Sequence, residues 1–276
     1  MKIYAFADEA SPTLDGQIAA MQRNRLDGLE IRGVDGQNVA DITPEKAAQI
    51  RRKLDAAGLV TWSIGSPIGK ISISDPFPAH LDKLRRVLET AHILGAENVR
   101  MFSFFLPCGC DPAQYRNQVL DQLGQMVQAA AGTGIRLCHE NEKGIYGDTA
   151  VRCLEIHRAL PELGGVLDPA NYIQCGVDPL QAWELLHPYI RYLHIKDALA
   201  DGSVVPAGHG IGHLEDILRA FRARGGSHVT LEPHLTVFDG LSGLEQADNS
   251  SKIGAYVYAS QSEAFDTACN ALKNLL

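Results

Sequence analysis

Short apolar segments alternate with longer amphipathic segments along the whole chain. Each apolar segment is four to six residues long, the length of a buried strand. Runs without a polar alternation are typical of parallel sheets that are covered on both faces. The eight predicted strands are Lys2–Ala7, Gly28–Ile31, Leu59–Ile64, Asn98–Phe102, Ile135–His139, Gly165–Asp168, Ile190–His194 and Ser227–Leu231.

The segments that follow the strands carry the pattern of helices. After the first strand, Leu14, Ile18 and Met21 recur at spacings of four and three, which places them on one helix face. Thr43 before Pro44 is a typical helix start, and a glycine at 58 is a typical helix end. Further helices are predicted at about 43–57, 79–94, 113–131, 149–160, 179–187, 214–224 and 263–275.

Eight strand–helix repeats predict a (β/α)₈ TIM barrel, an α/β fold that forms a single domain over residues 1–276. An open doubly wound sheet is the alternative. Such a sheet often has a glycine-rich phosphate-binding turn after its first strand, whereas here Ala7 is followed by Asp8 and Glu9. In a barrel, all the carboxyl ends of the strands lie on one face, and active sites are built there.

Four of the predicted strands end on, or directly before, a side chain that can bind a metal ion. These side chains are Glu140, Asp168, His194 and Glu232, separated by 28, 26 and 38 residues. They follow the fifth to eighth strands, which are neighbours in the predicted barrel, so we expect them to converge. Three carboxylates and one imidazole suit a single divalent cation such as Mn²⁺, Mg²⁺, Co²⁺ or Zn²⁺.

Each of these four residues also has an ordinary structural interpretation. Asp168 precedes Pro169, a common start of a turn. His194 alone is compatible with a buried core histidine, and Glu140 and Glu232 alone are compatible with loop carboxylates. One shared site explains all four positions together, whereas the structural alternative needs four independent accidents.

Composition and charge narrow the function classes. The chain has 25 basic and 33 acidic side chains, a formal charge of −8, which argues against a nucleic-acid partner because such proteins normally carry a basic face. No apolar run approaches the ~20 residues that span a bilayer. The first residues enter a strand without a signal-peptide pattern. Six scattered cysteines agree with a reduced cytoplasmic protein.

The chain resembles the sugar phosphate isomerase/epimerase-like barrels, also described as xylose isomerase-like. The resemblance covers essentially the entire chain. It rests on the pairs Glu140–Asn141 and Asp168-x-x-Asn171, on His194-x-Lys196–Asp197, and on Glu232–Pro233.

The resemblance implies that Glu140, Asp168, His194 and Glu232 are the metal ligands. In the ketose 3-epimerase members of that family, the first and last of these glutamates also serve as the acid/base pair. Those members, and the apurinic-site endonucleases, usually have histidine where this chain has Asn171. Asparagine is a poorer metal ligand, so we expect one cation here.

These observations predict a metal-dependent isomerase or epimerase that acts on a small sugar or sugar phosphate by proton transfer next to a carbonyl. The main alternative is a metal-dependent dehydratase of an inositol-type ketone, with Lys196 or His209 as the acid. An apurinic-site endonuclease and a non-catalytic sugar-binding barrel are further alternatives.

Other side chains at the predicted mouth are candidates for binding or support. Arg32 is expected either to pair with Glu9 or to hold a substrate anion, and Trp62 either to stack on a sugar or to lie in the core. The predicted substrate contacts are Glu9, Arg32, Trp62, Lys70, Asn171, Lys196 and His209, and the predicted supports of the ligands are Asn141, Asp197 and His234.

The segment 235–260 is rich in Gly, Ser and Asp and is unusually long for a connection between a strand and a helix. We expect it to form a lid over the site or a contact in a homo-oligomer.

Overall fold

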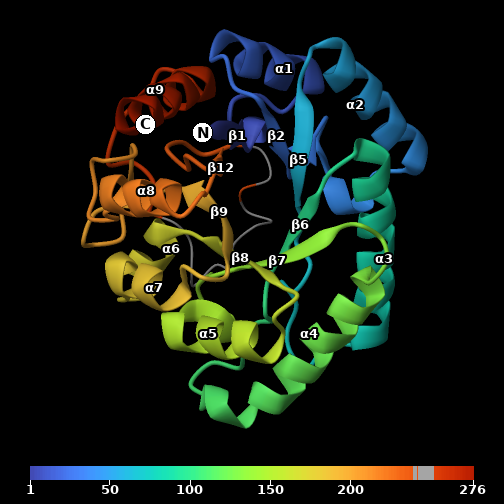
Figure 1. Ribbon diagram of the computed structural model, residues 1–276. Helices are drawn as coiled ribbons and strands as arrows, with labels where there is room; N and C mark the ends of the chain where they lie inside the picture. Colours follow the sequence, from blue (N-terminus) through green and yellow to red (C-terminus); the bar gives the residue numbers. More distant parts are fainter. Residues whose placement is uncertain (239–240, 242–251) are drawn as a thin grey trace.

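Eight parallel strands close into a barrel in the computed structural model, which describes residues 1–238, 241 and 252–276 (Figure 1). The order around the barrel is β1-β12-β9-β8-β7-β6-β5-β2, and β2 pairs with β1. The strands are β1 (Lys2–Ala5), β2 (Gly28–Ile31), β5 (Val60–Gly65), β6 (Asn98–Met101), β7 (Arg136–Glu140), β8 (Gly164–Leu167), β9 (Ile190–Ile195) and β12 (His228–Leu231). The predicted TIM barrel is confirmed.

Helices surround the strands on the outside of the barrel (Figure 1). They are α1 (Leu14–Arg23), α2 (Pro44–Ala56), α3 (Phe77–Leu94), α4 (Arg116–Ala130), α5 (Ala150–Ala159), α6 (Pro169–Gln174), α7 (Pro179–Leu186), α8 (Leu214–Ala223) and α9 (Gln261–Leu275). The Thr43 hydroxyl accepts the Lys46 N–H at the start of α2, with Pro44 as the first helical residue. Local capping chemistry therefore sets this boundary as predicted.

Two departures from the predicted elements shape the mouth of the barrel. Strand β1 ends at Ala5, and Ala7–Glu9 form a 3₁₀ turn in place of further strand. Helix α6 was not predicted. It begins at Pro169 because the Asp168 carboxylate accepts the Asn171 N–H at 2.9 Å. Both departures place acidic side chains where the strands end.

Small two-stranded sheets follow two of the barrel strands. The hairpin of β3 (Gly33–Val34) and β4 (Gln37–Asn38) follows β2, and β10 (Asp197–Ala198) with β11 (Val204–Val205) follows β9. Both extend the carboxyl-terminal face of the barrel.

Aromatic rings fill the opposite, amino-terminal end of the barrel. Trp62 stacks on His228, with ring centroids 4.0 Å apart, and on Tyr4 at 5.3 Å. His228 is the first residue of β12, and Trp62 lies three residues before the end of β5. The indole is therefore a core residue remote from the strand ends, and the prediction that Trp62 contacts substrate is corrected.

The last helix closes the ring of helices beside the first. Arg23 of α1 forms an ion pair with Asp266 of α9 at 2.8 Å, and the two helices lie next to each other at the top of Figure 1. In the part of the chain that the structure describes, no helix is long and apolar enough to cross a membrane. The predicted lid or oligomer contact at 235–260 falls partly on residues 239–240 and 242–251, which lie outside the described residues.

Candidate metal centre

The four predicted ligands meet at the carboxyl-terminal end of the barrel. Each of Glu140, Asp168, His194 and Glu232 offers one ligand atom, and these atoms all lie within 4.8 Å of one another. Glu140 and His194 lie in β7 and β9, and Asp168 and Glu232 directly follow β8 and β12. These four strands are neighbours in the barrel, and all four residues are buried. Three carboxylates and an imidazole at this spacing fit a single divalent cation.

His194 is held between three carboxylates, two at Nδ1 and one at Nε2 on the opposite side of its ring. Its Nδ1 lies 2.9 Å from Glu140 Oε1 and 3.3 Å from Glu232 Oε2, whereas its Nε2 lies 3.1 Å from Glu30 Oε2. Burial disfavours the imidazolium, but Glu140 and Glu30 outweigh burial and raise the pKa of His194 well above its ordinary value. The ring therefore presents Nδ1 to the ligand set and Nε2 to a supporting carboxylate.

Glu30 is itself held in position by two hydroxyl groups. It is fully buried in β2, and its Oε1 accepts the Tyr192 hydroxyl at 2.9 Å and the Ser63 hydroxyl at 3.2 Å. A carboxylate on the far nitrogen of a metal-binding histidine is a common orienting device in proteins.

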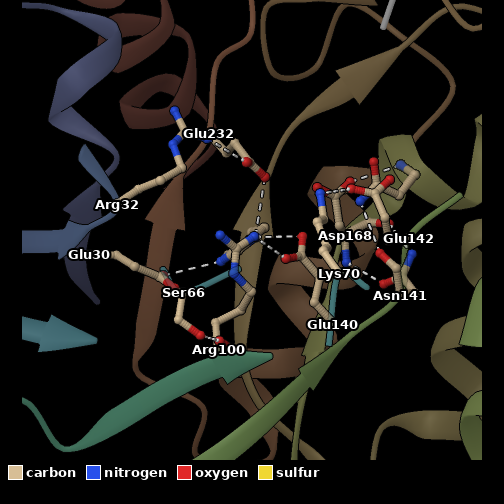
Figure 2. Close-up of polar contacts among 12 residues, drawn as sticks. Glu30, Arg32, Ser66, Lys70, Arg100, Glu140, Asn141, Glu142, Asp168 and Glu232 are labelled. Atoms are coloured by element: carbon tan, nitrogen blue, oxygen red, sulfur yellow. Dashed lines mark hydrogen bonds and ion pairs between the residues drawn. The ribbon is translucent and has the colours of Figure 1, made fainter. Parts of the chain in front are cut away.

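Arg100 of β6 pairs with Glu140, as Figure 2 shows. Its Nη1 donates to Glu140 Oε2 at 2.7 Å, and its guanidinium lies over the rings of Phe6 and Phe102. Burial opposes ionisation of Glu140, but His194 and Arg100 outweigh it and lower the pKa of this carboxyl to about 2. Glu140 is therefore an anion with one oxygen held by arginine and the other facing His194.

Asparagines join the ends of β7 and β8 around Asp168. Asn141 accepts the Asp168 N–H at 2.9 Å and donates to the Asp168 carbonyl at 3.0 Å. The Asn171 side chain donates to the Asn141 carbonyl at 2.9 Å. This exchange of hydrogen bonds fixes the backbone that carries Asp168, and so the predicted supporting role of Asn141 has a clear geometric basis.

Lys196 lies between two members of the ligand set. Its Nζ is 2.9 Å from Asp168 Oδ2 and 3.3 Å from Glu232 Oε2. Burial raises the pKa of Asp168 to about 7 although Lys196 opposes the shift. For Glu232, burial is outweighed by Lys196 and His234, which hold the pKa of this carboxyl well below its ordinary value.

A cavity opens above the ligand set. It is lined by Arg32, Pro67, Lys70, Arg100, Phe102, Glu142, Lys143, Asn171, Lys196, Glu232 and His234. Five of these side chains are cationic and two are carboxylates. The lining suits a ligand that is rich in oxygen.

Comparison with known proteins places this arrangement in a family. A model described as the xylose isomerase-like TIM barrel matches residues 18–250. The chain belongs to the xylose isomerase-like TIM barrel family. No curated protein sequence matches the chain.

Solved structures share the fold of this xylose isomerase-like barrel at low sequence identity. D-psicose 3-epimerase with D-fructose is 17% identical, with TM-score 0.78 and coverage of 99% of this chain and 98% of that chain. The probable 3-DHS dehydratase AsbF of Bacillus anthracis is 18% identical, with TM-score 0.76 and 99% of both chains covered. The IOLI protein with a bound zinc atom is 15% identical, with TM-score 0.75 and coverage of 100% and 98%.

The structure brings most of the predicted substrate contacts of this xylose isomerase-like barrel to the cavity. Arg32, Lys70, Asn171 and Lys196 line it, as does His234, which was predicted as a support. Lys70 pairs with Glu142 at 2.9 Å (Figure 2), and its ammonium group also lies over the Phe102 ring. Glu9 is buried behind Arg32, at 3.0 Å from Arg32 Nη2.

Two predicted residues have other surroundings. His209 is exposed, and its Nδ1 lies 3.4 Å from the Tyr256 hydroxyl. The Asp197 carboxylate accepts the backbone N–H groups of Gly208, Gly210 and Gly212 at 2.9, 3.0 and 2.9 Å. Asp197 therefore organises the loop after β9, and the prediction that it orients a ligand directly is corrected.

Glu30, Arg100 and Glu142 are charged residues at the site that were not among the predicted site residues. Glu30 and Arg100 are charged residues inside strands that are otherwise apolar and buried. Such charges need a partner, and that is the signal that marks them. The partners themselves are remote, since Glu30 meets His194 across 164 residues and Arg100 meets Glu140 across 40.

Proposed function

We propose that this chain is a divalent-metal-dependent isomerase or epimerase that moves a proton next to the carbonyl of a small sugar or sugar phosphate. One observation carries the proposal: Glu232 belongs to the ligand set and also lines the cavity. It is an ionised carboxylate at the point where a bound substrate meets the cation. The similarity to a D-psicose 3-epimerase and to a zinc-binding barrel supports the same chemistry.

Glu140, Asp168, His194 and Glu232 would hold the cation, which we expect to be one Mn²⁺, Mg²⁺, Co²⁺ or Zn²⁺ ion. When bound, such an ion supplies Lewis-acid polarisation of the substrate carbonyl. The protein supplies the orientation of the ligands through Glu30 behind His194 and Asn141 behind Asp168.

Glu232 is the carboxylate best placed to remove the proton. It reaches the cavity with Arg32 on one oxygen and Lys196 near the other. Lys196 keeps Glu232 ionised and so able to accept a proton, although a lowered pKa also makes the carboxylate a weaker base.

Glu140 approaches from the other side of the ligand set. It is carried by β7, and β8 and β9 separate that strand from β12. A substrate held over the cation would therefore have carboxyl groups at two sides. Return of the proton to the opposite face gives epimerisation, and return at the adjacent carbon gives isomerisation between aldose and ketose.

The cavity lining supports an oxygen-rich substrate. Lys70 and Lys196 provide ammonium groups, and Asn171 provides a buried amide. Ammonium and amide groups bind hydroxyl oxygens, and the ammonium groups also match a phosphate. The cavity is an unsuitable place for a large apolar ligand because its lining is mostly charged.

The test is the variant Glu232→Gln on a panel of ketoses, aldoses and their phosphates. Glutamine keeps an oxygen for the cation but cannot accept the proton, so we expect bound metal and a turnover roughly 10²- to 10⁴-fold lower. The control is Glu97→Gln, the same change at an exposed side chain on the far side of the barrel. Full turnover in metal-loaded Glu232→Gln contradicts the proton-transfer role.

A metal-dependent dehydratase is the second candidate. The observation that favours it is the pair of Lys196 and Glu232 at 3.3 Å beside the cavity, a base next to an ammonium group that can protonate a departing hydroxyl. The mass of the product decides between the two reactions, because dehydration removes one water. Nicking of abasic DNA would favour an endonuclease, and tight sugar binding without turnover would favour a non-catalytic barrel.

A further inference from the structure

A second set of possible metal ligands adjoins the first. Glu9, Glu232 and His234 each offer an atom within 4.8 Å of the others, and all three are buried. The set shares Glu232 with the centre described above. Two carboxylates and one imidazole at this spacing have the composition of a divalent-cation site.

A guanidinium group already fills this second set. Arg32 Nη2 lies 3.0 Å from Glu9 Oε1, and Arg32 Nη1 lies 3.1 Å from Glu232 Oε1. The same Nη1 is 3.3 Å from His234 Nε2. Every residue of the set therefore has an atom directed at Arg32, which is itself 2% exposed.

The position of Arg32 is fixed from three further directions. Asp8 accepts from Arg32 Nε at 2.9 Å and from Nη2 at 3.0 Å, a bidentate pair. The Phe6 ring centroid lies 4.4 Å from the guanidinium carbon, and the Phe238 ring centroid lies 4.8 Å from it. A planar group with several fixed donors meets these demands, whereas a lysine ammonium cannot span them.

The acidic partners of Arg32 are also held in place by the fold. Asp8 and Glu9 stand on the 3₁₀ turn that follows β1, and the backbone N–H of His234 donates to Glu9 Oε2 at 2.6 Å. Glu9 therefore has one oxygen on Arg32 and the other on the backbone after β12. The cluster links the ends of β1, β2 and β12.

The two oxygens of Glu232 have different partners because Arg32 contacts only one of them. Oε1 faces Arg32, while Oε2 lies 3.3 Å from both His194 Nδ1 and Lys196 Nζ. One oxygen is thus committed to the second set, and the other points toward the first (Figure 2). Rotation of the carboxylate would break the contact with Arg32.

We propose that Arg32 is a built-in cation that stands in place of a second metal ion and fixes Glu232 as a one-oxygen ligand of the first. This inference rests on the metal centre of the proposed function. Arg32 acts through Glu232 and is a positioning residue. The chain therefore takes one ion although it has ligands for two.

The test counts and locates Mn²⁺ in wild-type protein and in Arg32→Met, which keeps about the length of the aliphatic stem and removes the charged guanidinium group. Each metal-free protein is equilibrated with Mn²⁺ alone, and ions per chain are measured by elemental mass spectrometry. We expect one ion in the wild type and two in Arg32→Met. Anomalous diffraction of the variant should place the second ion between Glu9, Glu232 and His234.

Two further variants keep the test decisive. Arg32→Met leaves Asp8 buried without its partner, so Arg32→Met/Asp8→Asn serves if the single variant does not fold, with two ions again expected. Arg32→Met/Glu9→Gln removes a ligand of the second set and should return to one ion.

The outcomes separate this inference from the proposed function. One ion in both Arg32→Met and Arg32→Met/Asp8→Asn overturns the role of Arg32, as do two ions in the wild type. Wild-type protein that binds no ion contradicts the metal centre itself.

Discussion

The two ends of the barrel use the same kinds of side chain in opposite ways. At the amino-terminal end, His228 stacks on Trp62 at 4.0 Å, and Arg191 lies over the indole at 5.2 Å. At the carboxyl-terminal end, His194 contacts three carboxylates, and Arg100 pairs with Glu140. Histidine and arginine stack on an indole at one end, and they pair with buried carboxylates at the other. The partners that the fold provides decide the role.

This difference predicts that stability and metal binding can be changed separately. Substitutions among the stacked rings should affect unfolding and leave the cation in place. Substitutions among the carboxylates should lower metal affinity more than they lower the free energy of unfolding.

The largest expected effect is the loss of the ring stack in Trp62→Ala. The indole is 4% exposed, and truncation of a buried aromatic residue costs about 3–5 kcal/mol. Urea unfolding monitored by circular dichroism measures the change. Mn²⁺ affinity at 20 °C below the midpoint of thermal unfolding should match the wild type, and a large drop in affinity would show that the two ends are not separate.

Metal binding at the carboxyl-terminal end of the barrel should stabilise the folded protein. Mn²⁺ at 100 times its dissociation constant adds about 2.7 kcal/mol to the free energy of unfolding. The thermal midpoint of wild-type protein should rise with Mn²⁺ and fall back with a chelator. In His194→Ala the rise should be lost, whereas in Trp62→Ala it should persist, and equal shifts in both variants would contradict the assignment.

Glu30→Gln should lower the affinity for the cation without removing a residue that binds it directly. Glu30 Oε2 lies 3.1 Å from His194 Nε2 and supports the orientation of the ring. Loss of such a support typically costs 10- to 100-fold in metal affinity, about 1.4–2.7 kcal/mol. Isothermal titration with Mn²⁺ measures it. Unchanged affinity would mean that the stacking and packing around His194 suffice to orient it.

His80 should make a smaller contribution to the free energy of unfolding, and this contribution depends on pH. Its Nε2 accepts the Gly69 N–H at 2.8 Å, and burial lowers the pKa of His80 to about 4 with a further contribution from Lys83. The folded protein therefore binds fewer protons than the unfolded chain between pH 6.5 and 4. The contribution of His80 to stability is present above pH 6.5 and is lost as the pH falls toward 4, by at most about 1.4 kcal/mol per pH unit.

The control for that prediction is His80→Gln, which retains an acceptor but does not titrate. Urea unfolding from pH 7 to pH 4.5 should show a shallower loss of stability in the variant than in the wild type. Parallel curves would assign the acid sensitivity to the other buried histidines, such as His157, whose pKa burial lowers to about 4.

The sequence predicted the parts of the site that depend on strand order. Glu140, Asp168, His194 and Glu232 stand at or near the ends of neighbouring strands, so a correct fold was enough to bring them together. The predicted substrate contact of Trp62 was wrong because the indole lies three residues before the end of β5. It stacks there on His228 and Tyr4 at the amino-terminal end of the barrel.

The parts that failed depend on contacts between distant segments. Nothing local to Glu30 indicates His194. The predicted pairing of Arg32 with Glu9 is confirmed at 3.0 Å, but nothing local to Arg32 indicates its contacts with Glu232 and His234. Asp197 follows the ligand strand directly, yet three backbone N–H groups of the loop Gly208–Gly212 use its carboxylate. Side-chain direction at a strand end is set by the loops that pack there, and the sequence pattern does not encode it.

The most direct test of the account is an anomalous difference map of wild-type crystals grown with Mn²⁺. The account predicts one peak at roughly 2.0–2.3 Å from an oxygen of Glu140, Asp168 and Glu232 and from His194 Nδ1, with Glu30 still on His194 Nε2. A map without a peak among these four residues, or with the ion held elsewhere, would contradict the central claim.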